Sequence, residues 1–172
     1  MPSPVGHALG GIALGWDCSS RRGLATAAIL ALVSIAPDLD LLANSHRGES
    51  HSLGAAAIAG LAALAISSSA FAAVPTRRDR FRWAAAVSLA WSSHILLDWL
   101  SNDTRPPIGV MALWPFTRDY YKAGIEIFPP VSRRYWESRF WVHNLWALVV
   151  ELVVLLPITA IVVRRGRRRT SP

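Results

Sequence analysis

The sequence has little charge, one cysteine and one lysine among its 172 residues. The single Cys18 excludes an internal disulfide and any zinc cluster built from cysteines. Charged residues make up 17% of the chain, below the roughly 25% of soluble domains, while hydrophobic residues make up 52%. No basic n-region precedes the first apolar stretch, which argues against a cleaved signal peptide. These shortages favour a membrane protein over a soluble domain with a large core.

Two long apolar runs dominate the chain. Residues 53–74 carry no charge, and residues 141–163 are interrupted only by Glu151 and Pro157. Each run is long enough to cross a bilayer as a helix. Shorter apolar segments lie at 5–16, 24–43 and 83–100. We therefore expect one all-α domain over residues 1–172, a polytopic membrane bundle of about five helical segments.

Arginine accounts for all but one of the 18 basic residues, mostly in short groups between apolar segments. The groups lie at 21–22, 77–82 and 164–169. With five crossings all three lie on one side, which the positive-inside rule identifies as the cytoplasm, so residues 164–172 form a basic cytoplasmic tail. We interpret the net charge of +7 as a topology signal and expect no nucleic-acid partner.

The opposite, extracytoplasmic face is predicted to carry the 44–52 loop and the connection 101–140. This connection is rich in Pro, Trp and Arg and is predicted to form an ordered cap. The connection itself holds six basic residues, and basic residues on the outer side count against the predicted orientation. Several tryptophans are predicted to form an aromatic belt near the membrane interfaces: Trp16, Trp83, Trp99, Trp136 and Trp141.

All five histidines fall toward the predicted outer face: His7, His46, His51, His94 and His143. At about 1.5 Å per helical residue, His94 lies roughly 18 Å and Asp98 roughly 24 Å from Arg82. The hydrocarbon core is about 30 Å thick, so both side chains are predicted inside the outer leaflet rather than on its surface. An ionisable group at that depth is costly and indicates a function, with a partner nearby.

Two carboxylate motifs have the spacing of metal ligands. His94 and Asp98 in "SHILLDWL" are i and i+4, so both project from one helix face. In "APDLDLL", Pro37 is expected to end regular helix, and an extended i, i+2 spacing then aims Asp38 and Asp40 the same way. The alternatives are a buried hydrogen-bonded His–Asp pair and a simple helix cap.

The loop "SHRGESHS", residues 45–52, carries two further histidines. Gly48 allows a turn that brings His46 and His51 together, although a solvated loop is the alternative. Imidazole with carboxylate suits zinc, manganese or iron, and such mixed sites often hold two metals with a bridging carboxylate. The convergence of all these motifs on one face favours a metal centre over separate coincidences. His143 fits an interfacial residue better than a ligand, and Glu151 fits either a hydrogen bond within the bundle or support for the site.

Four motifs in the order "GHALGG", "IAPDLDLL", "SHRGESHSL" and "SHILLDWL", followed by "LWPF", span residues 6–116. With them the chain resembles the YdjM-like family of LexA-regulated, inner-membrane-associated, metal-dependent hydrolases. One departure is Glu49–Ser50, where the family has an aromatic residue and then Thr; it leaves the histidine spacing intact. The resemblance implies a multi-pass protein of the bacterial inner membrane. It also implies a metal site on His7, Asp38, Asp40, His46, His51, His94 and Asp98.

The expected function is hydrolysis of a phosphoester or ester in an amphiphilic, lipid-like substrate, with one or two divalent metal ions, zinc first. Asp40 or Asp38 would take the proton of the attacking water, and Arg47 would hold a phosphate or carboxylate unless it is only a surface charge. The site is also similar to that of zinc-dependent phospholipase C, by analogy alone. The expected partners are the lipid bilayer and a lipid-like small molecule. The alternatives are a metal transporter using the same ligands and a non-catalytic membrane protein.

Overall fold

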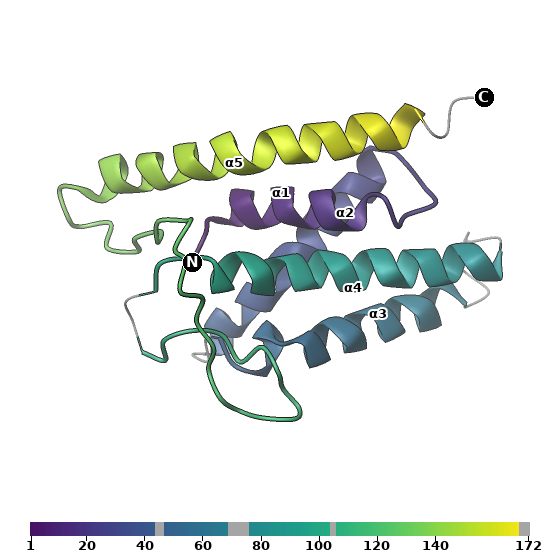
Figure 1. Cartoon of the computed structure of the whole chain (residues 1–172), viewed down its shortest axis with the longest axis horizontal. Helices are drawn as coiled ribbons and strands as arrows, with labels where there is room; N and C mark the ends of the chain where they lie inside the picture. Colours follow the sequence, from purple (N-terminus) through teal and green to yellow (C-terminus); the bar gives the residue numbers. More distant parts are fainter. Residues whose placement is uncertain (44–46, 69–75, 104–105, 169–172) are drawn as a thin grey trace.

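The computed structural model describes residues 1–43, 47–68, 76–103 and 106–168. Its helices are α1 (Pro4–Gly15), α2 (Leu24–Ile35), the 3₁₀ helices η1 (Ala36–Ala43) and η2 (Glu49–His51), α3 (Leu53–Ser67), α4 (Arg77–Trp99) and α5 (Phe140–Arg168) (Figure 1). The described residues form no β-strand, only two isolated bridges. Each of the five predicted apolar segments contains a helix, so the all-α prediction is confirmed.

Helix α1 is central, with α2, α4 and α5 packed around it (Figure 1). Its glycines permit this approach. A Cβ on Gly11 would lie 2.7 Å from the carbonyl oxygen of Leu30 in α2, and a Cβ on Gly15 would lie 2.8 Å from that of Ala86 in α4. Real Cβ atoms do not come that close to backbone, so these glycines are packing requirements. The tight packing also fixes His7 on the same helix.

The connection between α4 and α5 packs onto one end of the bundle. Phe128 is 2% exposed and lies between Leu97 of α4 and Leu155 of α5. Val110 is equally buried and pairs with Tyr121 in an antiparallel bridge. These buried anchors hold the irregular residues of the cap against the end of α4 that carries His94 and Asp98.

The segment after α2 differs from the sequence expectation. An extended backbone is predicted after Pro37, but residues Ala36–Ala43 form a 3₁₀ helix that continues directly from α2. The prediction is wrong because the helix tightens at Ala36, whose N–H is shared between two carbonyls of α2, and this accommodates the proline. With about three residues per turn, Asp38 and Asp40 leave the helix in different directions.

Two helical stretches are long and apolar enough to cross a membrane, Leu24–Leu41 and Phe140–Arg168. The 12 residues of α1 span about 18 Å and the 15 of α3 about 22 Å, less than the roughly 30 Å of a hydrocarbon core. Helix α4 has 23 residues but begins with four arginines within its first six residues. Five crossings are expected, but within the described residues only these two helical stretches have the length and composition to cross a membrane.

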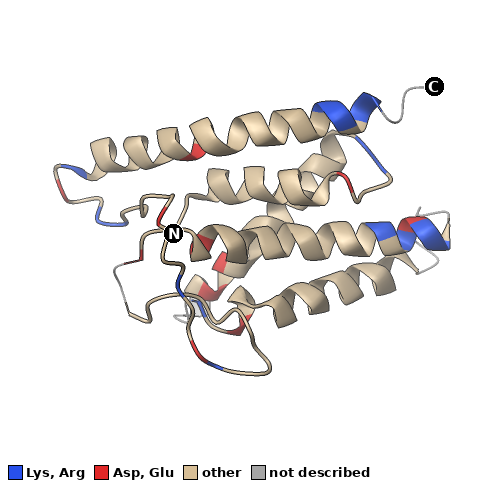
Figure 2. Cartoon of the chain, in the orientation of Figure 1, with Lys and Arg blue, Asp and Glu red and all other residues tan. Residues whose placement is uncertain are grey.

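The arginine groups gather at one end of the bundle. Figure 2 shows them on the turn between α1 and α2, at the start of α4 and at the end of α5. The acidic side chains of η1 and of the last turns of α4 lie toward the opposite end. The chain therefore has one strongly basic end, as the apolar and arginine patterns predict.

Gly11→Ala should destabilise the protein by about 1–3 kcal/mol, because the added methyl group would overlap Ser34 and the carbonyl of Leu30. Gly23→Ala is the matched control, since a Cβ there meets nothing within 4 Å and its φ of −175° is open to any residue. Thermal unfolding in detergent measures the difference. Equal melting temperatures for the two variants would contradict the close packing of α1 on α2.

Candidate metal centre

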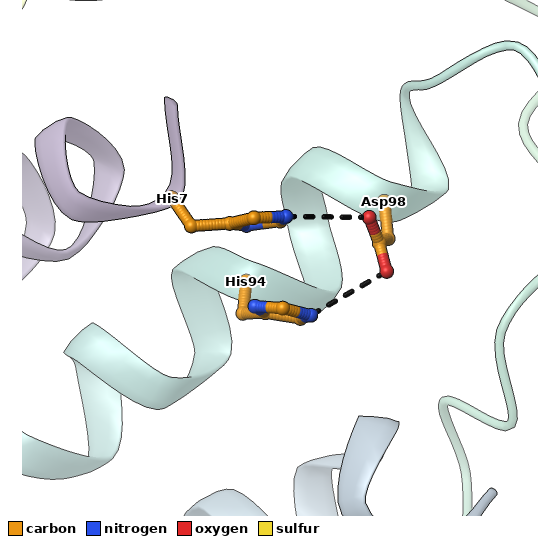
Figure 3. A group of neighbouring side chains, drawn as sticks. All are labelled: His7, His94 and Asp98. Carbon is orange, nitrogen blue, oxygen red and sulfur yellow. Dashed lines mark ion pairs between the residues drawn. The ribbon is translucent and has the colours of Figure 1, made fainter. Parts of the chain in front are cut away.

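Five buried or nearly buried imidazole and carboxylate groups meet at the capped end of the bundle. His7 comes from α1, Asp38 from η1, His51 from η2, and His94 and Asp98 from successive turns of α4. Figure 3 shows His7 and His94 stacked side by side, with Asp98 facing both. The structure thus brings together five of the seven predicted ligands. His46 lies outside the described residues.

The ring tautomers of two histidines are fixed by their partners. His94 Nδ1 lies 2.8 Å from the carbonyl oxygen of Ser34, and His51 Nδ1 lies 3.1 Å from Asp40 Oδ2. Because a carbonyl and a carboxylate only accept, both Nδ1 atoms donate. The two Nε2 atoms are 3.0 Å apart. If both rings are neutral, each Nε2 directs a lone pair at the other, so a proton or a cation between them would remove this repulsion.

Four ligand-type atoms lie close together here: the Nε2 atoms of His51 and His94, Asp38 Oδ1 and Asp98 Oδ2. From His51 Nε2, Asp38 Oδ1 is 3.7 Å and Asp98 Oδ2 is 3.5 Å away; from His94 Nε2 the same oxygens are 3.6 and 3.5 Å away. Ligands about 2.0–2.1 Å from a four-coordinate zinc ion lie about 3.3 Å from one another. The separations therefore fit a single divalent cation held by two imidazoles and two carboxylates.

Several atoms of the cluster have no hydrogen bond within the described part of the chain. They are both ring nitrogens of His7, both carboxylate oxygens of Asp98 and Oδ1 of Asp38. Buried polar groups in proteins are nearly always satisfied, and each exception needs an explanation. A proton on His51 Nε2 would be shared with His94 and attracted by the nearby carboxylates, but it would leave both ring nitrogens of His7 without a partner. A bound cation would satisfy the carboxylates as well, so the donor set fits a metal.

Asp98 faces two directions at once. Its Oδ2 is turned toward the pair His51 and His94, while its Oδ1 lies 3.6 Å from His7 Nε2 (Figure 3). The His7 ring stacks on His94 with centroids 3.8 Å apart. If metal ions were bound, Asp98 would be placed between the His51–His94 pair and His7, and each of these residues could serve as a ligand. The geometry is compatible with one or two ions.

His51 lies outside the two candidate spans, and its charge is governed by its neighbours. Burial lowers the pKa of its imidazole, but the contacts with Asp38 and Asp40 outweigh this and raise the pKa to about 9. A cation bound at Nε2 therefore displaces a proton from this ring at neutral pH.

Asp40 lies on the far side of His51 from the other ligands. Its Oδ2 accepts from the Ser50 hydroxyl at 2.8 Å and from the Arg47 backbone N–H at 3.1 Å, besides its contact with His51 Nδ1. A carboxylate in this position orients a metal-binding imidazole and strengthens it as a ligand. The structure therefore separates Asp38, whose Oδ1 faces the cluster, from Asp40, which supports His51.

The Arg47 side chain contacts the cap. Its guanidinium makes a short contact with Asp103 and donates to the carbonyl oxygen of Pro107 at 3.3 Å. The backbone of Arg47 has φ 65°, a left-handed conformation that is uncommon outside glycine and is held here by these contacts. Sequence reasoning missed Asp103, because nothing local links a cap carboxylate to an arginine 56 residues earlier.

Glu151 and His143 have separate structural roles. Glu151 is fully buried and accepts from the backbone N–H of Ser3 at 2.7 Å and from its hydroxyl, which anchors the start of α1 one turn before His7. A Cβ on Gly6 would lie 2.6 Å from the Glu151 carboxylate, so the two are in close contact. His143 donates from Nε2 to the carbonyl of Pro130 at 2.6 Å and takes no part in the cluster.

Fold and site together define a helical protein with membrane-length apolar helices and a buried cluster of imidazoles and carboxylates. The family model of the YdjM inner membrane protein matches residues 1–170, and the chain belongs to this family. The resemblance drawn from the four motifs is confirmed, and the family places the chain among inner membrane proteins. No significant match was found among curated proteins or among solved structures.

His94→Ala should abolish metal binding, because His94 contributes to both groups of candidate ligands. His143→Ala is the control, since it removes a histidine from the same end of the molecule without touching the cluster. Elemental mass spectrometry of detergent-purified protein, prepared without chelators and supplied with zinc, manganese or iron, measures the content. Equal metal content in the two variants would exclude the site.

Asp40→Asn should lower metal affinity by about 10–100-fold without abolishing binding, because the amide supports His51 less well than a carboxylate does. Asp119→Asn is the control, as Asp119 is exposed and contacts only Thr117 among the described residues. Competition of each variant with a fluorescent zinc chelator gives the affinities. An unchanged affinity of Asp40→Asn would show that Asp40 does not act through His51.

Proposed function

We propose that the chain is a membrane-bound metal-dependent hydrolase that cleaves a phosphoester or ester of an amphiphilic substrate. The observation that carries the proposal is the set of four acceptor atoms, two imidazole nitrogens and two carboxylate oxygens, spaced as ligands of one cation. Zinc is the first candidate, and manganese or iron also suits these donors. When bound, such an ion polarises the ester oxygen and lowers the pKa of water.

Of the described side chains that make up the cluster, Asp38 is the most exposed. The side chains of His51 and His94 are 0% exposed and that of Asp98 is 1% exposed, whereas Asp38 is 13% exposed. We infer that water and substrate approach the cluster from the side of Asp38. We assign Asp38 Oδ1 to the ligands, the second oxygen of the same carboxylate to the proton of the attacking water, and Asp40 to the positioning of His51.

The surface around the helices favours a lipid-like substrate. Apolar side chains stay exposed along α5 at Val142, Leu145, Trp146, Val149, Val153 and Leu156. An apolar stripe of this length on a helix that fits a membrane span faces lipid rather than water. A site at the end of such a helix lies near the headgroup level, where the scissile bond of an amphiphile is found.

The packing between the cluster and the arginine end of the bundle argues against a transporter. Trp16, Leu30, Ala86 and Ala90 are packed together toward the arginine end, each at most 1% exposed. The buried hydroxyls of Ser34 and Ser93 close to the cluster are hydrogen-bonded to each other and to backbone carbonyls. A conduit for metal ions needs polar groups along its length, and this packed apolar layer offers none.

The hydrolase proposal is tested on protein reconstituted in nanodiscs and loaded with zinc or manganese. We expect release of nitrophenol from bis-p-nitrophenyl phosphate or from p-nitrophenyl butyrate. Chelation should abolish the release and added metal should restore it. Asp38→Ala should lower the rate by about 100-fold or more, because it removes the proton acceptor.

Asp17→Ala is the matched control, since Asp17 lies at the far end of α1 and pairs with Arg22. Turnover that persists in the chelated protein, or equal rates for Asp38→Ala and Asp17→Ala, would contradict the proposal. Metal flux into proteoliposomes without cleavage of either ester would favour the transporter instead.

A further inference from the structure

A cavity of about 420 Å³ lies beside the cluster, between the cap and the start of α5. Its size is within the range of small-molecule binding sites. Arg47 connects the two places, because its side chain lines the cavity while its backbone N–H donates to Asp40, which contacts His51. A ligand in the cavity would therefore be linked to the candidate metal centre through Arg47 and Asp40.

Arg47 presents an unsatisfied donor at this cavity. Its side chain is 8% exposed, and its Nε has no hydrogen-bond partner within the described part of the chain. Its contacts with Asp103 and with the carbonyl of Pro107 both use Nη1. The Nε atom is enclosed, so Nη2, which makes no described hydrogen bond, is the donor left for a ligand oxygen in the cavity.

A second arginine stands at the rim. Arg133 lines the cavity and pairs with no carboxylate among the described residues, its one described hydrogen bond going to the sulfur of Met1. The neighbouring Arg134 is already neutralised by Glu137 at 2.9 Å. The cavity thus has one arginine held by Asp103, one by Glu137 and one without a counter-charge. This surplus of positive charge suits an anion.

Exposed aromatic side chains flank the cavity. Tyr135, Trp136 and Trp141 are 75%, 70% and 77% exposed, and they lie in sequence next to the lining residues Arg134 and Glu137 or one turn from them. Amphipathic aromatic rings are typical of the membrane interface at headgroup level. An anion that reaches this cavity therefore approaches from the plane of lipid headgroups.

We propose that the cavity binds a phosphate group, with Arg47 and Arg133 as its donors, and that it holds the phosphate of the substrate beside the cluster. The description of that ligand as substrate rests on the hydrolase function proposed above. A lipid headgroup and a free phosphate ion offer the same binding chemistry, and the experiment below distinguishes them. The cavity selects phosphoesters over carboxylic esters.

The test measures equilibrium binding, so it does not depend on turnover. Isothermal titration calorimetry in detergent compares inorganic phosphate with dihexanoyl phosphatidic acid, before and after metal removal by a chelator. Arg133→Gln should weaken phosphate binding by about tenfold, because one of two charge-assisted contacts is lost. Arg118→Gln is the control: it removes the same charge from the cap, at a side chain that is 77% exposed and does not line the cavity.

Weaker binding in Arg133→Gln than in Arg118→Gln, persisting after chelation, supports the phosphate site even if no ester is cleaved. Tighter binding of phosphatidic acid than of inorganic phosphate identifies a lipid headgroup as the ligand, and equal binding identifies the phosphate group alone. Binding that disappears on chelation and is equal in the two variants would place the anion on the metal and overturn the proposal. Absence of binding in the wild-type protein would overturn it as well.

Discussion

The candidate metal centre depends on two imidazole nitrogens that face each other, His51 Nε2 and His94 Nε2, 3.0 Å apart. Each ring is turned into this position because its other nitrogen donates to a fixed acceptor, Asp40 in one case and the carbonyl of Ser34 in the other. Carboxylates on two sides complete a pocket of acceptors in a buried place, and acceptors gathered in this way are stable only around positive charge. The cluster thus suits positive charge, which a protonated imidazole or a bound cation would supply.

The rest of the fold positions this cluster. Helix α1 carries glycine wherever α2 and α4 approach it, and Glu151 of α5 holds its first turn through Ser3. The cap is fixed by Phe128 and closes the end of the bundle around the arginine–aspartate pair of Arg47 and Asp103. Charged side chains are therefore concentrated in the capped interior and at the arginine end, whereas the exterior of α5 is apolar.

Much of the site could be predicted from local spacing. The i, i+4 relation of His94 and Asp98 holds because one helix carries both, and the "APDLDLL" motif does deliver Asp38 to the cluster. The different role of Asp40 could not be predicted, since it follows from the 3₁₀ geometry of η1 rather than from the assumed extended backbone. Likewise the short segment 5–16 is counted among the five expected crossings, although the 12 residues of α1 span only about 18 Å.

The sequence by itself determined the helical class, the inner membrane family, the positions of the ligand-bearing motifs and the separation of arginines from histidines. These follow from composition, periodicity and short-range spacing, which are local properties of the chain. Only the tertiary structure decided that Asp98 faces His7 as well as His94 and His51, that Arg47 binds Asp103, and that a cavity adjoins the cluster. Apart from the i, i+4 pair of His94 and Asp98, these side-chain contacts join residues 47 to 91 positions apart, and they arise from how helices pack rather than from any pattern along the chain.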